Sequence, residues 1–310
     1  MKTFISTTIA IFFGLSLIAQ SPVNLKLNLE KNKIYRVSSS SEQNMTVTYG
    51  GTPQKIESKS TITVSFKPLN TTADYLLIEI CFDTIKIKMS MPKMEMNSSK
   101  PGNIKSGNPS EIVGCILNRL GTFKLVAKIS TSGKFMGFEN YKTVKANILE
   151  IIDSVPATKK AQVQMMAEGI IKETNLQSMV EPFFAYLPEK AVNNGDKWET
   201  SYVQASAQSN MLLSNTFTLN SIENNTAKIS GKSEIESMPS NEPAKEGAPQ
   251  MSTEAKGAST SDLTVYLSTG LISKGSTKSH IEGTMTMKNQ GNEMKMPFVI
   301  DLQSEINKVE

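Results

Sequence analysis

Hydrophobic and polar residues alternate along many short stretches of this chain. In Ile85–Met91 every second residue is apolar, while Lys86, Lys88 and Ser90 lie between them. A period of two places apolar side chains on one face of a β-strand and polar ones on the other. Tyr75–Phe82 is apolar almost throughout, as in a strand buried on both faces. Strands are predicted at Leu25–Leu29, Ile62–Phe66, Tyr75–Phe82, Ile85–Met91, Phe123–Ile129, Leu263–Leu267 and Phe298–Leu302.

Helical signals are confined to the middle of the chain. The segment Asn108-Pro109-Ser110-Glu111 combines a capping residue, a proline at the first helical position and an acidic residue in the first turn. It predicts a short helix that ends near Leu120. A longer helical region is predicted from about Thr143 to Ala185, divided by Pro156.

One segment has the composition of a disordered insertion. Glu236–Ser261 is rich in Pro, Ser, Glu, Lys and Ala and has no Ile, Leu, Val or aromatic residue. Such a segment buries too little apolar surface to offset the entropy of ordering. We therefore expect it to be a loop between two strands.

Short motifs recur in the same order in the two halves of the chain. The recurring segments are Thr63–Phe66, Asn70–Ala73 and Glu79-Ile80 in the first half, and Thr216–Leu219, Asn224–Ala227 and Glu234-Ile235 in the second. The prediction is a mainly β (α+β) fold of two repeated antiparallel curved-sheet modules. These span residues 21–140 and 191–310, with a helical linker at 141–190.

The N-terminus has the order of a secretory signal peptide. Met1-Lys2 is positively charged, an apolar stretch runs from Phe4 to Ile18, and Ala19-Gln20 precede Ser21-Pro22. Cleavage would remove residues 1–20, and the sequence shows no later apolar stretch of the roughly 20 residues that a spanning helix needs. The mature chain is expected in the periplasm or outside the cell.

The charge pattern argues against a nucleic-acid partner. The formal net charge is +4, and the basic residues are nearly all lysine, with arginine only at Arg36 and Arg119. Proteins that bind nucleic acids favour arginine and a concentrated basic face. The scattered lysines indicate a solvated surface.

Two cysteines, Cys81 and Cys115, would enter an oxidising compartment. A disulfide and a pair of buried free thiols are both compatible with the sequence, since pairing cannot be read from spacing alone.

Methionine is the unusual feature of the composition, with 17 residues. One cluster comprises Met89, Met91, Met94 and Met96, and another comprises Met285, Met287, Met294 and Met296. The second predicts a hairpin with Gln290-Gly291 at its tip. Its register would pair Met287 with Met294 and Met285 with Met296, and would place Lys288 opposite Glu293.

Three interpretations of these methionines stay open. They can be ordinary core, or an adaptable apolar surface that binds a ligand or partner through Met89, Met91, Met285, Met287, Met294 and Met296. They can also be a Cu(I) site formed by Met285, Met287, Met294 and Met296, because soft thioethers select Cu(I).

Catalytic signals are weak. The one histidine, His280, lies in a predicted strand without a nucleophile motif, and Glu79 and Glu234 occupy equivalent repeat positions without further context. No phosphate loop, dinucleotide fingerprint or calcium loop is present, so no cofactor is expected. The sequence favours a non-catalytic protein.

Three segments carry a resemblance to an uncharacterised family of exported bacterial envelope proteins. They are Leu27–Arg36, the run from Gly121 through Ser132-Gly133 to Glu139, and Leu187–Trp198, which ends in a Gly-Asp-x-Trp pattern. The resemblance covers most of the mature chain and implies a fold without an assigned activity. We expect an exported, non-catalytic protein that binds a lipophilic ligand or an envelope protein, with Cu(I) binding as the alternative and an unrecognised enzyme as the least favoured one.

Overall fold

Twelve antiparallel strands form one continuous open sheet. The computed structural model describes residues 21–90, 94–205, 210–238, 250–289 and 292–309. The strands are β1 (Tyr35–Tyr49), β2 (Thr52–Thr71), β3 (Tyr75–Met89), β4 (Met94–Asn97), β5 (Leu125–Ser130), β6 (Phe135–Phe138), β7 (Lys197–Ala205), β8 (Asn210–Glu223), β9 (Thr226–Met238), β10 (Gln250–Tyr266), β11 (Ile272–Asn289) and β12 (Asn292–Val309).

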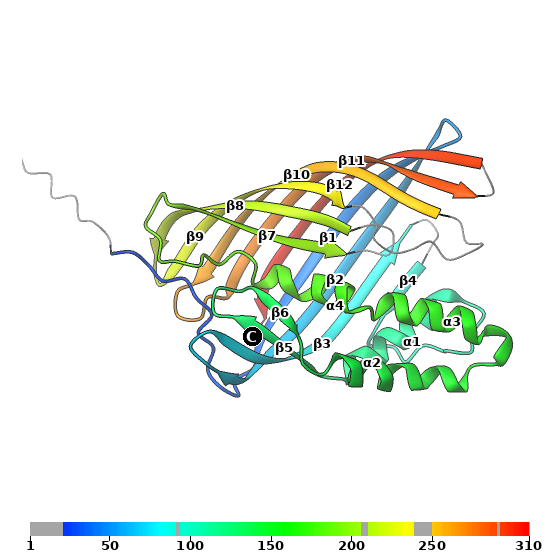
Figure 1. Cartoon of the computed structure of the whole chain (residues 1–310), viewed down its shortest axis with the longest axis horizontal. Helices are drawn as coiled ribbons and strands as arrows, with labels where there is room; N and C mark the ends of the chain where they lie inside the picture. Colours follow the sequence, from blue (N-terminus) through cyan, green and yellow to red (C-terminus); the bar gives the residue numbers. More distant parts are fainter. Residues whose placement is uncertain (1–20, 91–93, 206–209, 239–249, 290–291, 310) are drawn as a thin grey trace, which may run out of the picture.

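The sheet joins the two halves of the chain at its centre. The strand order is β6-β5-β3-β2-β1-β12-β11-β10-β9-β8-β7, and β4 extends β3 as a short branch. β1 pairs with β12 from Arg36 opposite Val309 to Val47 opposite Phe298. The predicted mainly β fold is confirmed, and both predicted modules contribute to the same sheet, which curves around the helices (Figure 1).

The helices follow β4 and β6. They are α1 (Pro109–Thr122), α2 (Tyr141–Leu149), α3 (Ala157–Ile170) and α4 (Glu173–Val180), with 3-10 turns η1 (Glu150–Ser154) and η2 (Glu181–Phe183). The predicted cap of α1 is present, because the Asn108 side chain accepts a hydrogen bond from the Ser110 backbone N–H at 2.9 Å. Pro156 immediately precedes α3 as its N-cap residue and divides the helical region, as its position predicts.

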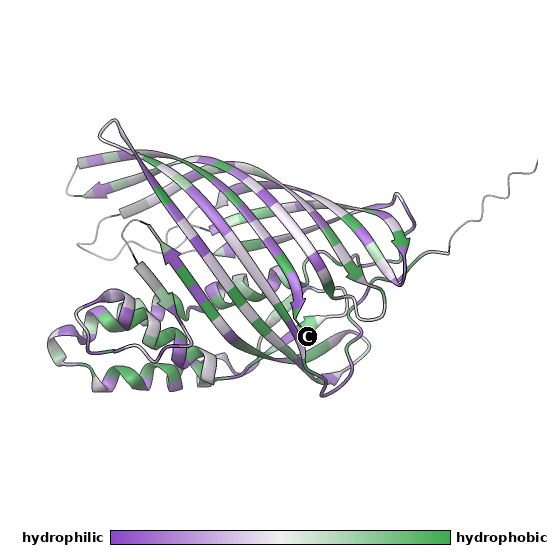
Figure 2. Ribbon diagram, turned by 180° about the vertical axis from the view of Figure 1, so that it is seen from behind, coloured by the Kyte–Doolittle hydropathy of each residue, from purple (hydrophilic) through white to green (hydrophobic). Residues whose placement is uncertain are grey.

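The core lies at one end of the sheet, where the helical segment packs on it. Phe66 of β2 is fully buried, and its ring lies 5.7 Å from that of Phe183 and 4.9 Å from that of Phe184. We call the sheet face that carries Phe66 the inner face. It faces the helical segment, whereas the outer face is seen from behind in Figure 2, where hydrophilic and hydrophobic residues alternate along the long strands.

The stretch after the helices ties β7 to this core. The Tyr186 hydroxyl donates a hydrogen bond to the Gly270 carbonyl oxygen at 2.5 Å, and the Trp198 indole N–H donates to the Tyr186 carbonyl oxygen at 2.9 Å. β7 is an edge strand, and the Ser178 hydroxyl of α4 accepts from the Ala205 backbone N–H at 2.7 Å. The helical segment therefore covers part of an edge that would otherwise expose unpaired backbone groups.

Leu25–Leu29 is not a strand, although its alternation is real. Leu25, Leu27 and Leu29 are all buried. The backbone N–H groups of Leu27 and Asn28 donate to Thr131 and Thr269, which lie in two different turns, so no regular ladder forms. The pattern predicted burial correctly and secondary structure wrongly.

The prediction of a disordered Glu236–Ser261 is wrong for most of that segment. β9 continues to Met238, and β10 begins at Gln250 and pairs with β11 over its whole length and with β9 from Lys256 onward. Residues 239–249 lie outside the described part of the chain. The first part of β10, residues 250–261, has no Ile, Leu, Val or aromatic residue, and its inner face there carries small residues such as Ala255, Gly257 and Ser259.

Candidate functional site

The methionine hairpin has the predicted register. Met285 lies opposite Met296, Met287 lies opposite Met294, and Lys288 lies opposite Glu293. The Lys288 Nζ and a Glu293 carboxylate oxygen are 3.4 Å apart on the outer face. All four thioethers therefore share the inner face.

Other methionines extend this surface. Met89 pairs with Met94 between β3 and β4, and Met45 and Met211 occupy inner-face positions of β1 and β8. Met91 lies outside the described residues. Met45 and Met211 were not predicted as site residues because neither lies in a cluster of methionines in the sequence. Their spacing of two from Val47 and Leu213 was the pattern that could have indicated their inner-face position. We define the methionine face as Met45, Met89, Met211, Met285, Met287, Met294 and Met296, with Ile56, Ile281 and Ile300 between them.

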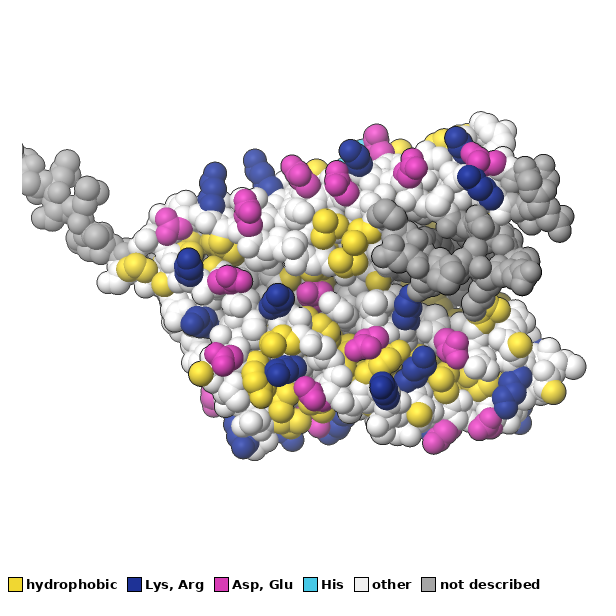
Figure 3. Space-filling view, in the orientation of Figure 1, with side chains coloured by type: hydrophobic (Ala, Val, Ile, Leu, Met, Phe, Trp, Pro, Cys, Tyr) yellow, Lys and Arg dark blue, Asp and Glu magenta, His cyan; other side chains and the backbone are white. Residues whose placement is uncertain are grey.

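The methionine face is not part of the main core. Its side chains are half-buried, and none belongs to the core or packs directly against it. It lies at the end of the strands remote from Phe66, since Met45 is ten positions further along the sheet than Tyr35, the partner of Phe66. In Figure 3, patches of exposed hydrophobic side chains lie over the middle of the strands and over the helical segment. A half-buried, apolar concave surface is typical of a ligand site.

A row of mostly polar residues, interrupted by Leu302 of β12 between Gln43 and Ser279, separates the methionine face from the core. Between neighbouring strands Ser58 faces Gln43, Ser279 faces Ser259, and Ser233 faces Asn215. An adjacent row repeats the pattern nearer the core. We define the polar band as Ser58, Gln43, Ser60, Ser41, Ser304, Thr277, Ser261, Ser279, Ser259, Ser233, Asn215 and Thr200.

Hydrogen bonds run along the polar band. The Ser41 and Ser60 hydroxyl oxygens are 2.7 Å apart. The Ser233 hydroxyl donates to Asn215 Oδ1 at 2.6 Å, and the Asn215 amide donates to the Thr200 hydroxyl oxygen at 3.2 Å. The inner face thus changes along the strands from apolar core to polar band to methionine face.

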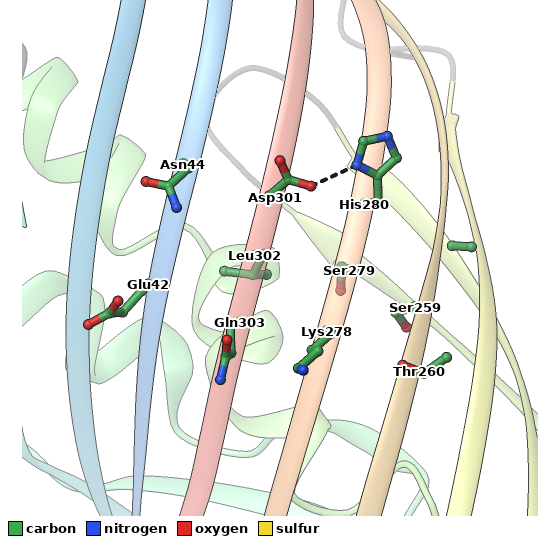
Figure 4. Close-up of a pocket in the computed structure, with 11 residues that line it drawn as sticks. Glu42, Asn44, Ser259, Thr260, Lys278, Ser279, His280, Asp301, Leu302 and Gln303 are labelled. Carbon is green, nitrogen blue, oxygen red and sulfur yellow. Dashed lines mark hydrogen bonds and ion pairs between the residues drawn. The ribbon is translucent and has the colours of Figure 1, made fainter.

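His280 belongs to a different cluster on the outer face. Its Nδ1 lies 2.7 Å from an Asp301 carboxylate oxygen (Figure 4), and its Nε2 lies 3.1 Å from a Glu282 carboxylate oxygen. The Asp301 hydrogen bond first, and that of Glu282 second, raise the pKa of His280 above its ordinary value of 6.5. Both ring nitrogens are engaged by carboxylate oxygens, so neither is free in this geometry to accept a proton from another group.

We expect proton NMR of the C2 and C4 ring protons to give His280 a pKa above 6.5, and Asp301→Asn to lower it. The cluster stabilises the fold at pH values below 6.5, where the histidine is charged in both states, and this contribution is lost as pH rises through the raised pKa. An unchanged titration in Asp301→Asn would show that the contact does not persist in solution.

The two equivalent glutamates do not meet. Glu79 lies in β3 and forms an ion pair of 2.9 Å with Lys124, whereas Glu234 is exposed on β9. Five strands separate β3 from β9 in the sheet order. An acid pair built from these residues is therefore excluded.

Both cysteines are free thiols in the structure. The Cys81 thiol donates to the Gly121 carbonyl oxygen at 3.5 Å, and burial raises the pKa of both thiols above the ordinary value. We expect each to react with iodoacetamide more slowly than free cysteine at pH 7.5, because the thiolate is the nucleophile. Mass spectrometry should show two added groups once the protein is denatured without reductant; none would reveal a disulfide.

Metal and membrane signals are few in the described part of the chain. No group of three or more His, Cys, Asp or Glu side chains gathers there as metal ligands. Among the same residues, none of the helices combines the length and apolar character needed to cross a membrane.

Solved structures resemble this chain only distantly. A lipovitellin structure, described by its lipid–protein interactions, aligns with a TM-score of 0.46 at 9% identity, covering 91% of this chain and 26% of that chain. This chain thus spans about a quarter of lipovitellin. An outer membrane channel from Pseudomonas putida aligns with a TM-score of 0.26 at 8% identity, covering 90% of this chain and 97% of that one. Neither value reaches 0.5, so the proposals below rest on the geometry of this chain.

Sequence comparison identifies a family. No curated protein matches the sequence. A model of a family of unknown function (DUF6263) matches residues 73–272, which include the strands β3 to β10 and the entire helical segment. The resemblance to an uncharacterised family is confirmed: the chain belongs to this family of unknown function.

Proposed function

We propose that this protein is exported and binds the hydrocarbon chain of an amphiphile, without catalysis, against the methionine face in the cell envelope. The observation that carries the proposal is the half-buried, apolar character of a concave surface that does not pack against the core. The N-terminal pattern of residues 1–20 supports export.

The chemistry of the methionine face suits such a ligand. Thioether side chains are unbranched and polarizable, so they adapt to irregular apolar shapes. Met285, Met287, Met294 and Met296 form two opposed cross-strand pairs. Gly283 opposite the buried Phe298 lies next to them, and Ile281 opposite Ile300 follows. Burying hydrocarbon against these residues stabilises a complex by about 0.8 kcal/mol for each methylene group removed from water.

Charges placed on the methionine face are expected to weaken binding. Met287→Glu combined with Met294→Glu should weaken saturable binding of a lipophilic fluorescent probe, N-phenyl-1-naphthylamine, by about tenfold or more, because an ionised carboxylate must be desolvated. Titration monitored by probe fluorescence measures this change.

Thr286→Glu is the matched control. Thr286 lies on the same strand with its side chain on the outer face, opposite Lys295, and should leave the affinity unchanged. Equal losses in the two proteins, or no saturable binding by the unaltered protein, would contradict the proposal.

Cu(I) binding by Met285, Met287, Met294 and Met296 remains the alternative prediction. Met294→Ile with Met296→Ile removes two soft ligands but keeps the surface apolar. Under reducing conditions, a loss of Cu(I) affinity in this variant with unchanged probe binding would support Cu(I) binding by these thioethers. Unchanged Cu(I) affinity would exclude these thioethers as its ligands.

The two halves of the sheet are also proposed to be related modules. β1-β2-β3-β5-β6 and β7-β8-β9-β10-β11 follow one another along the sheet in the same order, and β4 and β12 are the strands without a counterpart. Superposition of the halves tests this: it should bring Glu79 onto Glu234, and a consistent offset would count against duplication.

A further inference from the structure

A buried carboxylate borders the polar band. Glu181 directly follows α4, and only 7% of its surface is exposed. The Gln177 side-chain amide donates to Glu181 Oε2 at 2.9 Å. Burial raises the pKa of Glu181, while the Gln177 hydrogen bond opposes this effect. A carboxyl group is costly to bury, so its position calls for an explanation beyond packing.

Glu181 lines an open cavity of about 1350 Å³ between the helical segment and the strands β7 to β10. The same cavity reaches Thr200, Asn215, Ser233 and Ser259 of the polar band. Its other charged lining residues are exposed to solvent. These are Lys134, Glu189, Glu199, Lys232 and Glu234. Glu181 is therefore the buried charge of the cavity.

Two hydroxyl groups of the polar band that line the cavity with Glu181 have already committed their protons. Ser233 uses its hydroxyl proton on Asn215, and Thr200 uses its own on the Ala185 carbonyl oxygen at 2.6 Å. A hydroxyl whose proton is committed still offers oxygen lone pairs, and an ionised carboxylate only accepts. A ligand hydroxyl group that donates hydrogen bonds therefore finds acceptors at Glu181, Thr200 and Ser233.

We propose that Glu181 and the polar band form a head-group subsite that selects amphiphiles with a neutral, hydroxylated head and rejects free carboxylates. The inference rests on the proposed function, because it assumes that the hydrocarbon chain lies on the methionine face. A hydroxylated head donates to Glu181, Thr200 and Ser233. A carboxylate head offers the cavity only acceptors and a second negative charge.

The fluorescence of Trp198 can report ligand binding at the subsite. Trp198 is the one tryptophan of the chain, it lies two residues before Thr200 on the same face of β7, and its ring is 5.9 Å from that of Phe217. Its fluorescence can be titrated in residues 21–310 with 1-monolauroylglycerol and with laurate, which share the same acyl chain. We expect affinity for the glycerol ester to exceed that for laurate by about tenfold at pH 7.5.

Glu181→Gln should reduce this preference about fivefold, because the new amide donates to laurate and carries no charge. Glu189→Gln, at the exposed rim of the same cavity, should leave the preference unchanged. Equal affinity of the unaltered protein for both ligands, or an unchanged preference in Glu181→Gln, would overturn the subsite while the probe titration still supports the methionine face. Absence of saturable binding for 1-monolauroylglycerol, laurate and N-phenyl-1-naphthylamine alike would overturn both the subsite and the proposed function.

Discussion

Phe66→Ala is expected to lower the free energy of unfolding by about 3–5 kcal/mol, the usual range for removing a fully buried aromatic side chain. Phe66 has no exposed surface, and its ring packs edge-on against Phe183 and Phe184. The substitution removes the main contact through which the sheet holds the turn after α4. Urea unfolding monitored by circular dichroism measures the change.

Phe66→Leu provides the comparison. It keeps much of the apolar volume but loses both ring contacts, so its cost should be smaller, at about 1–2 kcal/mol. A loss below about 1 kcal/mol in Phe66→Ala would mean that the helical segment does not dock on β2 in solution.

Gly133→Ala is expected to destabilise the fold about as strongly, for a different reason. Gly133 has a φ of +83°, which a side chain disfavours by about 1–2 kcal/mol. A Cβ at this position would also collide with the carbonyl oxygen of Phe184, closer than real Cβ atoms approach. We expect a loss of at least about 3 kcal/mol in urea unfolding, because strain and steric overlap add.

Gly195→Ala separates these two causes. Gly195 has a φ of +87°, yet a Cβ there would meet no atom within 4 Å. It should lose only the conformational part, about 1–2 kcal/mol. Equal losses at the two glycines would show that the contact between the β5–β6 turn and Phe184 relaxes easily.

The alternation of residues predicted the strands best where the inner face is apolar. Ile62–Phe66 and Phe298–Leu302 lie within β2 and β12 as expected, and the methionine hairpin has the predicted register. In the polar band the same rule fails. Serine and threonine indicate an outward position, so nothing in Gln250–Ser261 marks which of its faces points inward.

The burial of Glu181 could not be predicted from the sequence, for a related reason. Glu181 follows a helix and precedes Pro182, as exposed acidic residues often do. Its burial depends on β7 and β8, which lie later in the chain, and on Gln177 one turn earlier. His280 likewise acquires Asp301 only through the pairing of β11 with β12. Local pattern cannot predict such neighbours.

The central pairing of β1 with β12 also bears on how the chain reaches its native state. Contacts between the first and last strands close the longest loop in the molecule, and folding slows as the sequence separation of native contacts grows. The strands on either side of this pairing, β1 to β6 and β7 to β12, can pair with their neighbours in sequence before β1 pairs with β12. During synthesis β1 would pair with β2 but lack its other neighbour until the chain is nearly complete, so closure of the sheet at its centre would be the last step of folding.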